Sequence, residues 1–308
     1  MENVAFVFPG QGSQAVGMLA ELAQSNDVIG KTFAEASDAL GYDLWDLVAN
    51  GPAETLNETD KTQPALLTAS VAIWRAYQAS NKTMPSLLAG HSLGEYSALV
   101  CAGVIEFTDA VKLVELRGKL MQQAVPAGSG AMFAIIGLDD DAIAKACAES
   151  AEGSVVSPVN YNSPGQVVIA GEKAAVERAA AACKAAGAKM TVALPVSVPS
   201  HCALMKPAAD ELAKALIEVT FSEPTINVVN NVDVAMPTDS QAIKDALVRQ
   251  LYCPVRWSES VEFMATQGVT KLIECGPGKV LTGLTKRINK SISAQAVNDA
   301  ASFAALVE

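Results

Sequence analysis

Short apolar runs alternate with amphipathic stretches along most of the chain. The run at residues 4–8 ends at Pro9-Gly10, and Leu87-Leu88-Ala89 precedes a stretch of helical character that ends at Gly103. Similar runs at 226–229 and 270–275 predict two more strands. This alternation predicts an α/β protein with a parallel sheet covered by helices on both faces. Helices are expected near residues 15–24, 28–40, 63–80, 95–102, 108–124 (starting at Thr108-Asp109), 203–217, 240–251, 258–267 and 279–288.

The middle of the chain has a different order of elements. Asn162-Ser163-Pro164-Gly165 is a strong turn signal between two predicted strands. The full order is β-α-β-β-α-β, which is that of a ferredoxin-like module. We therefore predict a ferredoxin-like small domain at residues 127–197, inserted into a larger domain formed by residues 1–126 and 198–308. Its strands are expected at 131–137, 155–160, 166–170 and 189–196, and its helices at 139–148 and 173–186.

The composition limits the classes of protein that fit. Hydrophobic residues make up 50% and charged residues 18% of the 308 residues, so we expect a sizeable buried core. The formal net charge is −11 and the sequence pI is about 4.8, which argues against nucleic-acid binding because that needs a basic surface. No run of 18 apolar residues occurs, so we expect no membrane span.

The cysteines and histidines favour a cytoplasmic protein without a metal site. Six cysteines are scattered without a C-x-x-C pair, and the two histidines are far apart in the sequence. Scattered thiols fit a reducing compartment. The start, Met1-Glu2-Asn3, is acidic, and the first apolar run is too short for a signal peptide.

The pentapeptide Gly90-His91-Ser92-Leu93-Gly94 has the G-x-S-x-G pattern between a predicted strand and a predicted helix. This is the context of a nucleophile elbow, in which a sharp turn exposes the serine hydroxyl at the top of the sheet. The N-terminus of the following helix offers free N–H groups to a developing oxyanion. The alternative is a glycine-flanked turn with an ordinary serine, and the flanking elements make it the weaker interpretation.

A serine nucleophile needs a general base, and histidine is the usual one. His91 adjoins Ser92, and neighbouring side chains on a sharp turn usually point apart. His201 lies in a loop, between residues of strand character and a helical run from Ala203. Elimination makes Ser92 and His201 the leading catalytic pair, and their order in the chain matches that of hydrolase-like elbows.

Two glycine-rich turns follow predicted strands. The pattern G-x-G-x-x-A at residues 10–15 would indicate a dinucleotide site only with an acidic residue at the end of a second strand, and Glu35 and Asp38 fall in a helical pattern instead. The turn more simply brings Gln11 to the carboxyl ends of the strands, where ligands bind. Gly276-Pro277-Gly278-Lys279 lacks the full frame of a phosphate loop, which favours a tight strand-to-helix turn.

Other polar residues have two interpretations from the sequence. Arg117 lies mid-helix among apolar residues, where a snorkelling or ion-paired arginine is the simpler interpretation. The cluster at residues 286–290 is either a basic patch for an acidic partner or a helix end whose cations complement the dipole. Turn formation is the expected role of the asparagines at strand ends, which are Asn160, Asn162, Asn230 and Asn231.

Motifs in a fixed order over nearly the whole chain are more specific than the elbow alone. Together they resemble the malonyl-CoA:acyl carrier protein transacylases of bacterial type II fatty acid synthesis. The matching stretches are Phe8-Pro9-Gly10-Gln11-Gly12-Ser13-Gln14, Thr62-Gln63-Pro64-Ala65-Leu66, Gly90-His91-Ser92-Leu93-Gly94-Glu95-Tyr96, Arg117-Gly118, Asn160-Tyr161-Asn162-Ser163-Pro164-Gly165-Gln166, Pro199-Ser200-His201-Cys202, Asn230-Asn231-Val232, Gln250-Leu251-Tyr252 and Glu274-Cys275-Gly276-Pro277-Gly278.

The resemblance implies a hydrolase-like parallel-sheet domain with a ferredoxin-like insert. It implies that Ser92 is the nucleophile and His201 its base. It also implies that the Leu93 backbone N–H and Gln11 form the oxyanion hole. The chain departs from the family pattern at Cys253, where asparagine is usual.

The resemblance further implies that Arg117 binds the malonyl carboxylate and that Gln250 presents a carbonyl to the other ring nitrogen of His201. The implied reaction moves a malonyl group from coenzyme A to the phosphopantetheine thiol of acyl carrier protein, through a malonyl-serine intermediate. Malonyl-CoA and the acidic carrier protein, docked on a local basic patch, are then the partners. No permanently bound cofactor is expected, because the coenzyme A thioester is a substrate.

Two other functions are compatible with the sequence, one with the same catalytic groups and one without catalysis. An esterase or thioesterase would let water attack the acyl-serine, and a non-catalytic subunit would bind the carrier protein on a retired enzyme fold. An intact Ser92 and His201 argue against the non-catalytic subunit. The hydrolase differs from a transferase in whether water can attack the acyl-serine.

Overall fold

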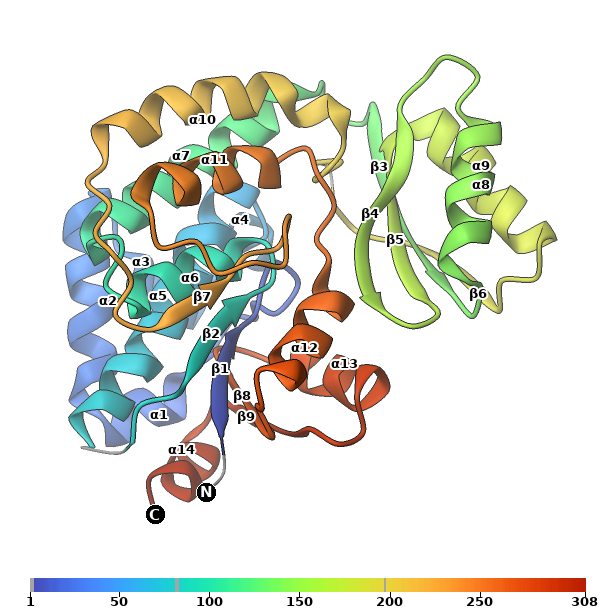
Figure 1. The fold of residues 1–308 in the computed structure, drawn as a ribbon. Coiled ribbons are helices and arrows are strands. Elements are labelled where there is room, and N and C mark those ends of the chain that lie inside the picture. Colours follow the sequence, from blue (N-terminus) through green and yellow to red (C-terminus); the bar gives the residue numbers. More distant parts are fainter. Residues whose placement is uncertain (1–2, 81–82, 197) are drawn as a thin grey trace.

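A five-stranded parallel sheet forms the centre of the larger part of the computed structural model, which describes residues 3–80, 83–196 and 198–308 (Figure 1). The strand order is β7-β2-β1-β8-β9, and every neighbouring pair is parallel. The prediction of a parallel sheet is confirmed. The strands are β1 (Val4–Phe8), β2 (Leu87–Gly90), β7 (Asn227–Val229), β8 (Lys271–Cys275) and β9 (Ser293–Val297).

Alternate residues of the central strand β1 enter two separate cores, one on each face of the sheet. Phe6 and Phe8 belong to one buried cluster, and Ala5 and Val7 belong to the other. The first core is covered by α2 (Asp27–Leu40), α5 (Thr59–Ala79), α6 (Leu93–Cys101), α7 (Phe107–Ala124), α10 (Lys206–Glu218) and α11 (Ser240–Gln250), and the second by α12 (Trp257–Thr266) and α13 (Val280–Ile288).

Several boundaries differ from the prediction. The helix expected near 15–24 begins only at Ala20, and the helix expected from residue 63 begins at Thr59, so that Pro64 lies inside it. The proposed start signal Thr108-Asp109 is wrong, since α7 begins at Phe107 without a side-chain cap. The helix expected at 203–217 divides into the 3-10 turn η1 (Ala203–Met205) and α10. Short or partly exposed elements were not predicted: α3 (Leu44–Asn50), α4 (Ala53–Leu56), β9 and α14 (Ala300–Val307).

The middle of the chain forms a second, antiparallel sheet of order β4-β5-β3-β6, which lies beside the large sheet in Figure 1. The predicted β-α-β-β-α-β order is confirmed. The predicted last strand, 189–196, is shorter, because pairing with β3 ends at Ala193. The elements are β3 (Gly130–Ile136), α8 (Asp140–Ser150), β4 (Val156–Ser163), β5 (Gln166–Glu172), α9 (Lys173–Ala185) and β6 (Met190–Ala193).

The two faces of the second sheet have different surroundings. One face packs against α8 and α9 around Ile135, Ile143 and Ile169. The other face contributes Met132 and Val168 to a small cluster that also holds Cys202, next to His201. This second face therefore meets the loop that carries His201. In the described part of the chain, no helix has both the length and the apolar character needed to cross a membrane.

Candidate active site

The turn between β2 and α6 holds Ser92 in a backbone conformation that residues other than glycine rarely adopt, with φ 52° and ψ −109°. A Cβ on Gly90 would lie 1.9 Å from the Gly94 carbonyl carbon, and one on Gly94 would lie 2.0 Å from the Phe8 carbonyl oxygen. Both positions of the G-x-S-x-G pattern therefore require glycine, because strand and helix pass in direct contact. The strained serine is the feature expected of a nucleophile elbow.

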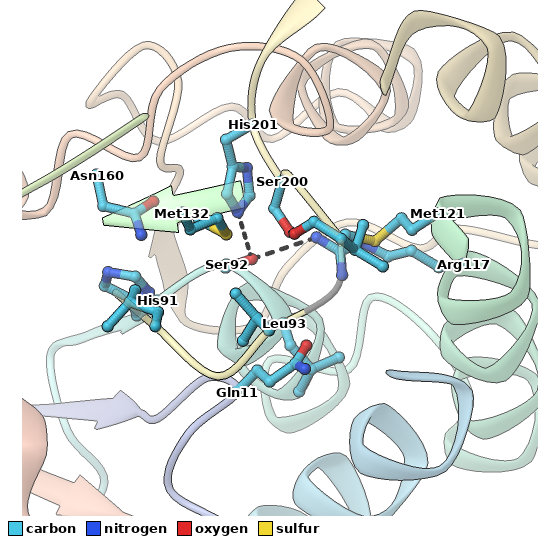
Figure 2. A pocket seen from close by; sticks show the side chains of 13 residues that line it. Gln11, His91, Ser92, Leu93, Arg117, Met121, Met132, Asn160, Ser200 and His201 are labelled. Carbon is cyan, nitrogen blue, oxygen red and sulfur yellow. Dashed lines mark hydrogen bonds between the residues drawn. The ribbon is translucent and has the colours of Figure 1, made fainter. Parts of the chain in front are cut away.

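Ser92 and His201 meet at hydrogen-bond distance. Ser92 Oγ lies 2.8 Å from His201 Nε2 (Figure 2). On the other side of the ring, His201 Nδ1 lies 2.6 Å from the Gln250 carbonyl oxygen. Since a carbonyl oxygen only accepts, Nδ1 carries the proton and Nε2 offers its lone pair to the serine hydroxyl. This is the tautomer that a general base needs.

His201 is held firmly in the protein interior. Its backbone N–H donates to the Leu251 carbonyl at 2.9 Å, and the residue is 3% exposed. Burial, followed by the charge of Arg117, lowers the pKa of His201 to about 3. The imidazole is therefore neutral at physiological pH and ready to accept a proton.

The Arg117 side chain extends from α7 to the Ser92 hydroxyl, and the residue is 1% exposed. Its Nη1 donates to Gln63 Oε1 at 2.8 Å, and its Nη2 donates to Gln250 Oε1 at 3.0 Å and to Ser92 Oγ at 3.3 Å. No described carboxylate lies within 4.0 Å of it. The snorkelling and ion-paired interpretations are both wrong, because the cation is buried and its hydrogen-bond partners are neutral.

A cavity of about 100 Å³ brings these groups together between the two sheets. Gln11 and Leu93 line it beside Ser92, and Met132 and Asn160 reach it from the second sheet (Figure 2). As the first residue of α6, Leu93 has a backbone N–H that no carbonyl of its own helix receives. The remaining lining residues are His91, Arg117, Met121, Leu194, Val196, Val198, Ser200 and His201.

All six residues predicted for the site therefore lie in or directly behind one cavity. Gln11, Ser92, Leu93, Arg117 and His201 line it, and Gln250 stands behind His201. The structure places them without assigning their roles. Among the described residues, no group of three or more histidine, cysteine or acidic side chains is arranged to hold a metal ion.

Two asparagines have contacts that the sequence analysis missed. Asn231 Oδ1 accepts from the Ser92 N–H at 2.7 Å, and its Nδ2 donates to the Gly90 carbonyl at 2.7 Å. Asn162 Oδ1 lies 2.8 Å from His91 Nε2, so the His91 side chain is engaged away from the Ser92 hydroxyl, as expected. Of the four asparagines, Asn230 has the predicted turn role, accepting from the Asp233 N–H at 2.9 Å.

Glu95 is a second buried polar group that the sequence analysis did not single out. Its Oε2 accepts from Gln250 Nε2 and from the Asn231 N–H, both at 2.9 Å. Burial raises the pKa of Glu95 to about 7, although these hydrogen bonds and the charge of Arg117 lower it. Its sequence signals were its position three residues after Ser92 and its place in the stretch from Gly90 to Tyr96 that carries the family resemblance.

The two remaining sequence motifs lie at the ends of α13. Residues 276–279 form the expected turn between β8 and α13, and the buried carboxylate of Glu274 accepts from the Leu281 and Thr282 N–H groups there. Lys286 and Arg287 lie in the last turn of α13, as the helix-end interpretation requires. Both side chains are exposed.

Comparisons with known proteins give the family. Residues 5–306 match the acyl transferase domain family. The malonyl CoA-acyl carrier protein transacylase of Salmonella typhimurium is 70% identical over 305 residues, which is 99% of this chain and 99% of that protein. The crystal structure of an acyl carrier protein S-malonyltransferase from Vibrio cholerae has a TM-score of 0.97 and 70% identity, and covers 99% of this chain and 100% of that one.

A further solved structure holds a malonyl-transacylase in complex with a type II PKS acyl-carrier protein. It has a TM-score of 0.99 and 66% identity, and the match covers 100% of this chain and 99% of that one. The matches span the whole length of these relatives, so the likeness is not confined to the elbow. The chain belongs to the malonyl CoA-acyl carrier protein transacylase family of acyltransferases.

Proposed function

We propose that this chain transfers a malonyl group from coenzyme A to the phosphopantetheine thiol of an acyl carrier protein, for fatty acid biosynthesis. The observation that carries the proposal is the buried guanidinium of Arg117, 3.3 Å from Ser92 Oγ with neutral hydrogen-bond partners. A buried cation without a counter-charge is costly. A carboxylate on the acyl group would supply that charge, and the planar fork of arginine suits it through two parallel hydrogen bonds.

In the first half-reaction, Ser92 Oγ attacks the thioester carbonyl carbon while His201 Nε2 takes the hydroxyl proton. Negative charge develops on the carbonyl oxygen, and we assign its stabilisation to the Leu93 N–H and Gln11, since both residues line the cavity beside Ser92. The tetrahedral intermediate then expels the coenzyme A sulfur, which takes the proton from the imidazolium. The product is a malonyl ester of Ser92 and free coenzyme A.

In the second half-reaction, the same groups act in reverse order. The phosphopantetheine thiol gives its proton to His201 Nε2 and attacks the ester carbonyl. Ser92 Oγ leaves and recovers the proton, so the enzyme returns to its starting state. The Gln250 carbonyl, 2.6 Å from His201 Nδ1, holds one tautomer of the ring through both halves. It stabilises the imidazolium less than a carboxylate would, which an activated thioester tolerates.

A thioesterase would form the same acyl-serine and differ in the attacking group. The experiment is to incubate the protein with malonyl-CoA, with and without a holo acyl carrier protein, and to quantify free malonate and malonyl-carrier. Transfer predicts release of coenzyme A with little malonate, and malonyl-carrier when the acceptor is present. Steady release of malonate at the same rate in both samples would assign the protein as a hydrolase.

We propose that the acidic carrier docks on the basic patch, defined as Lys286, Arg287 and Lys290. These side chains are exposed, and Arg287 Nη1 donates to Gln166 Oε1 of the second sheet at 2.7 Å. The patch therefore lies at the end of α13 where that helix meets the small sheet, on a chain whose net charge is −11. The complex of a 66% identical malonyl-transacylase with an acyl-carrier protein supports a carrier partner.

We also propose that residues 127–197 form an inserted domain, and that residues 1–126 and 198–308 form the larger one. The separate antiparallel sheet and its own core with α8 and α9 support this division. Residue 197, at the boundary, and the acidic start Met1-Glu2 lie outside the described residues. The six cysteines are free thiols, which supports a cytoplasmic location. The proposed reaction needs no resident cofactor, because the coenzyme A thioester is itself a substrate.

A further inference from the structure

Glu95 is a buried acidic group at the site for which the mechanism above has no use. It is 2% exposed, and no described lysine or arginine lies within 4.0 Å of its carboxylate. Its Oε2 accepts two hydrogen bonds, one from Gln250 Nε2 and one from the Asn231 N–H. Burying a carboxylate costs free energy, so we expect Glu95 to have a role toward the groups that it contacts.

Those contacts fix which way the Gln250 side-chain amide faces. The amide nitrogen only donates, and it lies 2.9 Å from Glu95 Oε2 and 3.1 Å from the Ser92 carbonyl oxygen, which both only accept. The amide oxygen must then face the other way, where it accepts from Arg117 Nη2 at 3.0 Å. A flipped amide would turn its N–H groups toward a cation.

We propose that Glu95 is a positioning residue for malonyl specificity, acting through the Gln250 amide to hold the Arg117 guanidinium beside Ser92. The inference rests on the proposed function, since it assumes a substrate carboxylate bound by Arg117. It is important that Glu95 acts through the neutral Gln250 amide and does not contact Arg117 directly. A carboxylate in direct contact would neutralise Arg117, whereas an amide oxygen orients it and leaves its charge for the substrate.

The chain offers a matched control in Glu274. It is also buried, at 1% exposure, and its carboxylate also accepts hydrogen bonds from backbone N–H groups, those of Leu281 and Thr282. It has no hydrogen bond to the Gln250–Arg117 pair. A general cost of losing a buried carboxylate should therefore be similar in variants of Glu274 and Glu95.

The experiment compares kcat/KM for acylation by malonyl-CoA and by acetyl-CoA in Glu95→Ala, Glu95→Gln and the corresponding Glu274 variants. We expect the malonyl-to-acetyl ratio to fall at least tenfold in Glu95→Ala, and less in Glu95→Gln, which keeps one acceptor oxygen. The Glu274 variants should keep the ratio of the parent. In an Arg117→Ala background, Glu95→Ala should leave the ratio unchanged, because no guanidinium remains to be placed.

Folding of each variant is checked by circular dichroism and thermal unfolding. If Glu95→Ala does not fold, Glu95→Gln decides, with a ratio at least threefold below the parent expected. An equal loss with both acyl groups, or the same shift in the Arg117→Ala background, would overturn the inference and leave Glu95 a purely structural group. Failure of the proposed function looks different, because the parent protein itself would then take up no malonyl group or would release it steadily as malonate.

Discussion

Replacing Arg117 by alanine should change which acyl group the protein uses. The substitution removes a cation that is 1% exposed and donates to Gln63, Gln250 and Ser92. A malonyl carboxylate entering the variant site would lose its water without gaining charge-assisted hydrogen bonds, each of which contributes about 1.5–3 kcal/mol. An acetyl group carries no carboxylate and would escape the penalty of facing an unpaired cation.

The magnitude follows from the bonds lost. Taking the loss of charge-assisted bonding as at least about 2 kcal/mol, kcat/KM for malonyl-CoA should fall roughly thirtyfold or more. Activity with acetyl-CoA should rise relative to activity with malonyl-CoA. Arg117→Lys should recover only part of the malonyl rate, since an ammonium lacks the planar fork of arginine. The control is Arg75→Ala, which removes a half-buried arginine paired with Glu35 on α2, away from the site.

The assay is the rate of Ser92 acylation by malonyl-CoA and acetyl-CoA in the parent, the two Arg117 variants and the Arg75 control. The decisive quantity is the malonyl-to-acetyl ratio, which cancels losses common to both substrates. An unchanged ratio in Arg117→Ala, with the protein folded, would refute the assignment and make Arg117 a structural cation.

Three further predictions follow from the same geometry. His201→Ala should slow acylation by about 10³-fold or more, the scale of losing a triad member. Stopped-flow acylation rates would measure this loss, and a loss below tenfold would contradict the assignment of His201 as the base. Burial and the Arg117 charge lower the pKa of His201 to about 3, so the base is already neutral at pH 5. With acetyl-CoA, whose use does not depend on Glu95, kcat/KM for acylation should therefore vary little between pH 5 and 8. A limb near pH 6.5, the pKa of an unperturbed imidazole, would show that the ring is not buried beside the cation. Charge reversal at the basic patch, Lys286→Glu with Arg287→Glu, should raise KM for the carrier protein and leave acylation by malonyl-CoA unchanged. A titration with holo carrier protein at low salt would measure KM, and an unchanged KM would place the docking surface elsewhere.

Local sequence signals were sufficient for the elements that build the centre of the site. Strands β1 and β8, and the strand β2 that leads into the elbow, are apolar runs that end at glycine or proline. Their positions could be predicted directly from the sequence. Short elements with little apolar periodicity escaped, such as β9, whose residues Ser293 to Val297 are mostly small or polar. Helix α3 was missed although Asp43 caps its start and Gly51 follows its end, so a better use of the cap signals could have found it.

The polar network around the site could not be derived from local patterns. Asn231 contacts Ser92 across 139 residues and Gln250 contacts Glu95 across 155 residues, so no spacing rule connects them. For Arg117 the local pattern was misleading, because its flanking apolar residues fit a snorkelling side chain equally well. Its partners Gln63 and Gln250 come from α5 and α11, and only the folded structure shows that these neutral amides, rather than a carboxylate, meet the guanidinium.

The most direct test of the account is the intact mass of the protein after brief exposure to malonyl-CoA, measured for the parent and for Ser92→Ala. The parent should gain the mass of one malonyl group, located on the Ser92 peptide, and lose it when holo acyl carrier protein is added. Ser92→Ala should fold normally and gain nothing, since it lacks the attacking oxygen. A malonyl adduct on Ser92→Ala, or a parent that never becomes acylated, would contradict the central claim that Ser92 carries the malonyl group between two thiols.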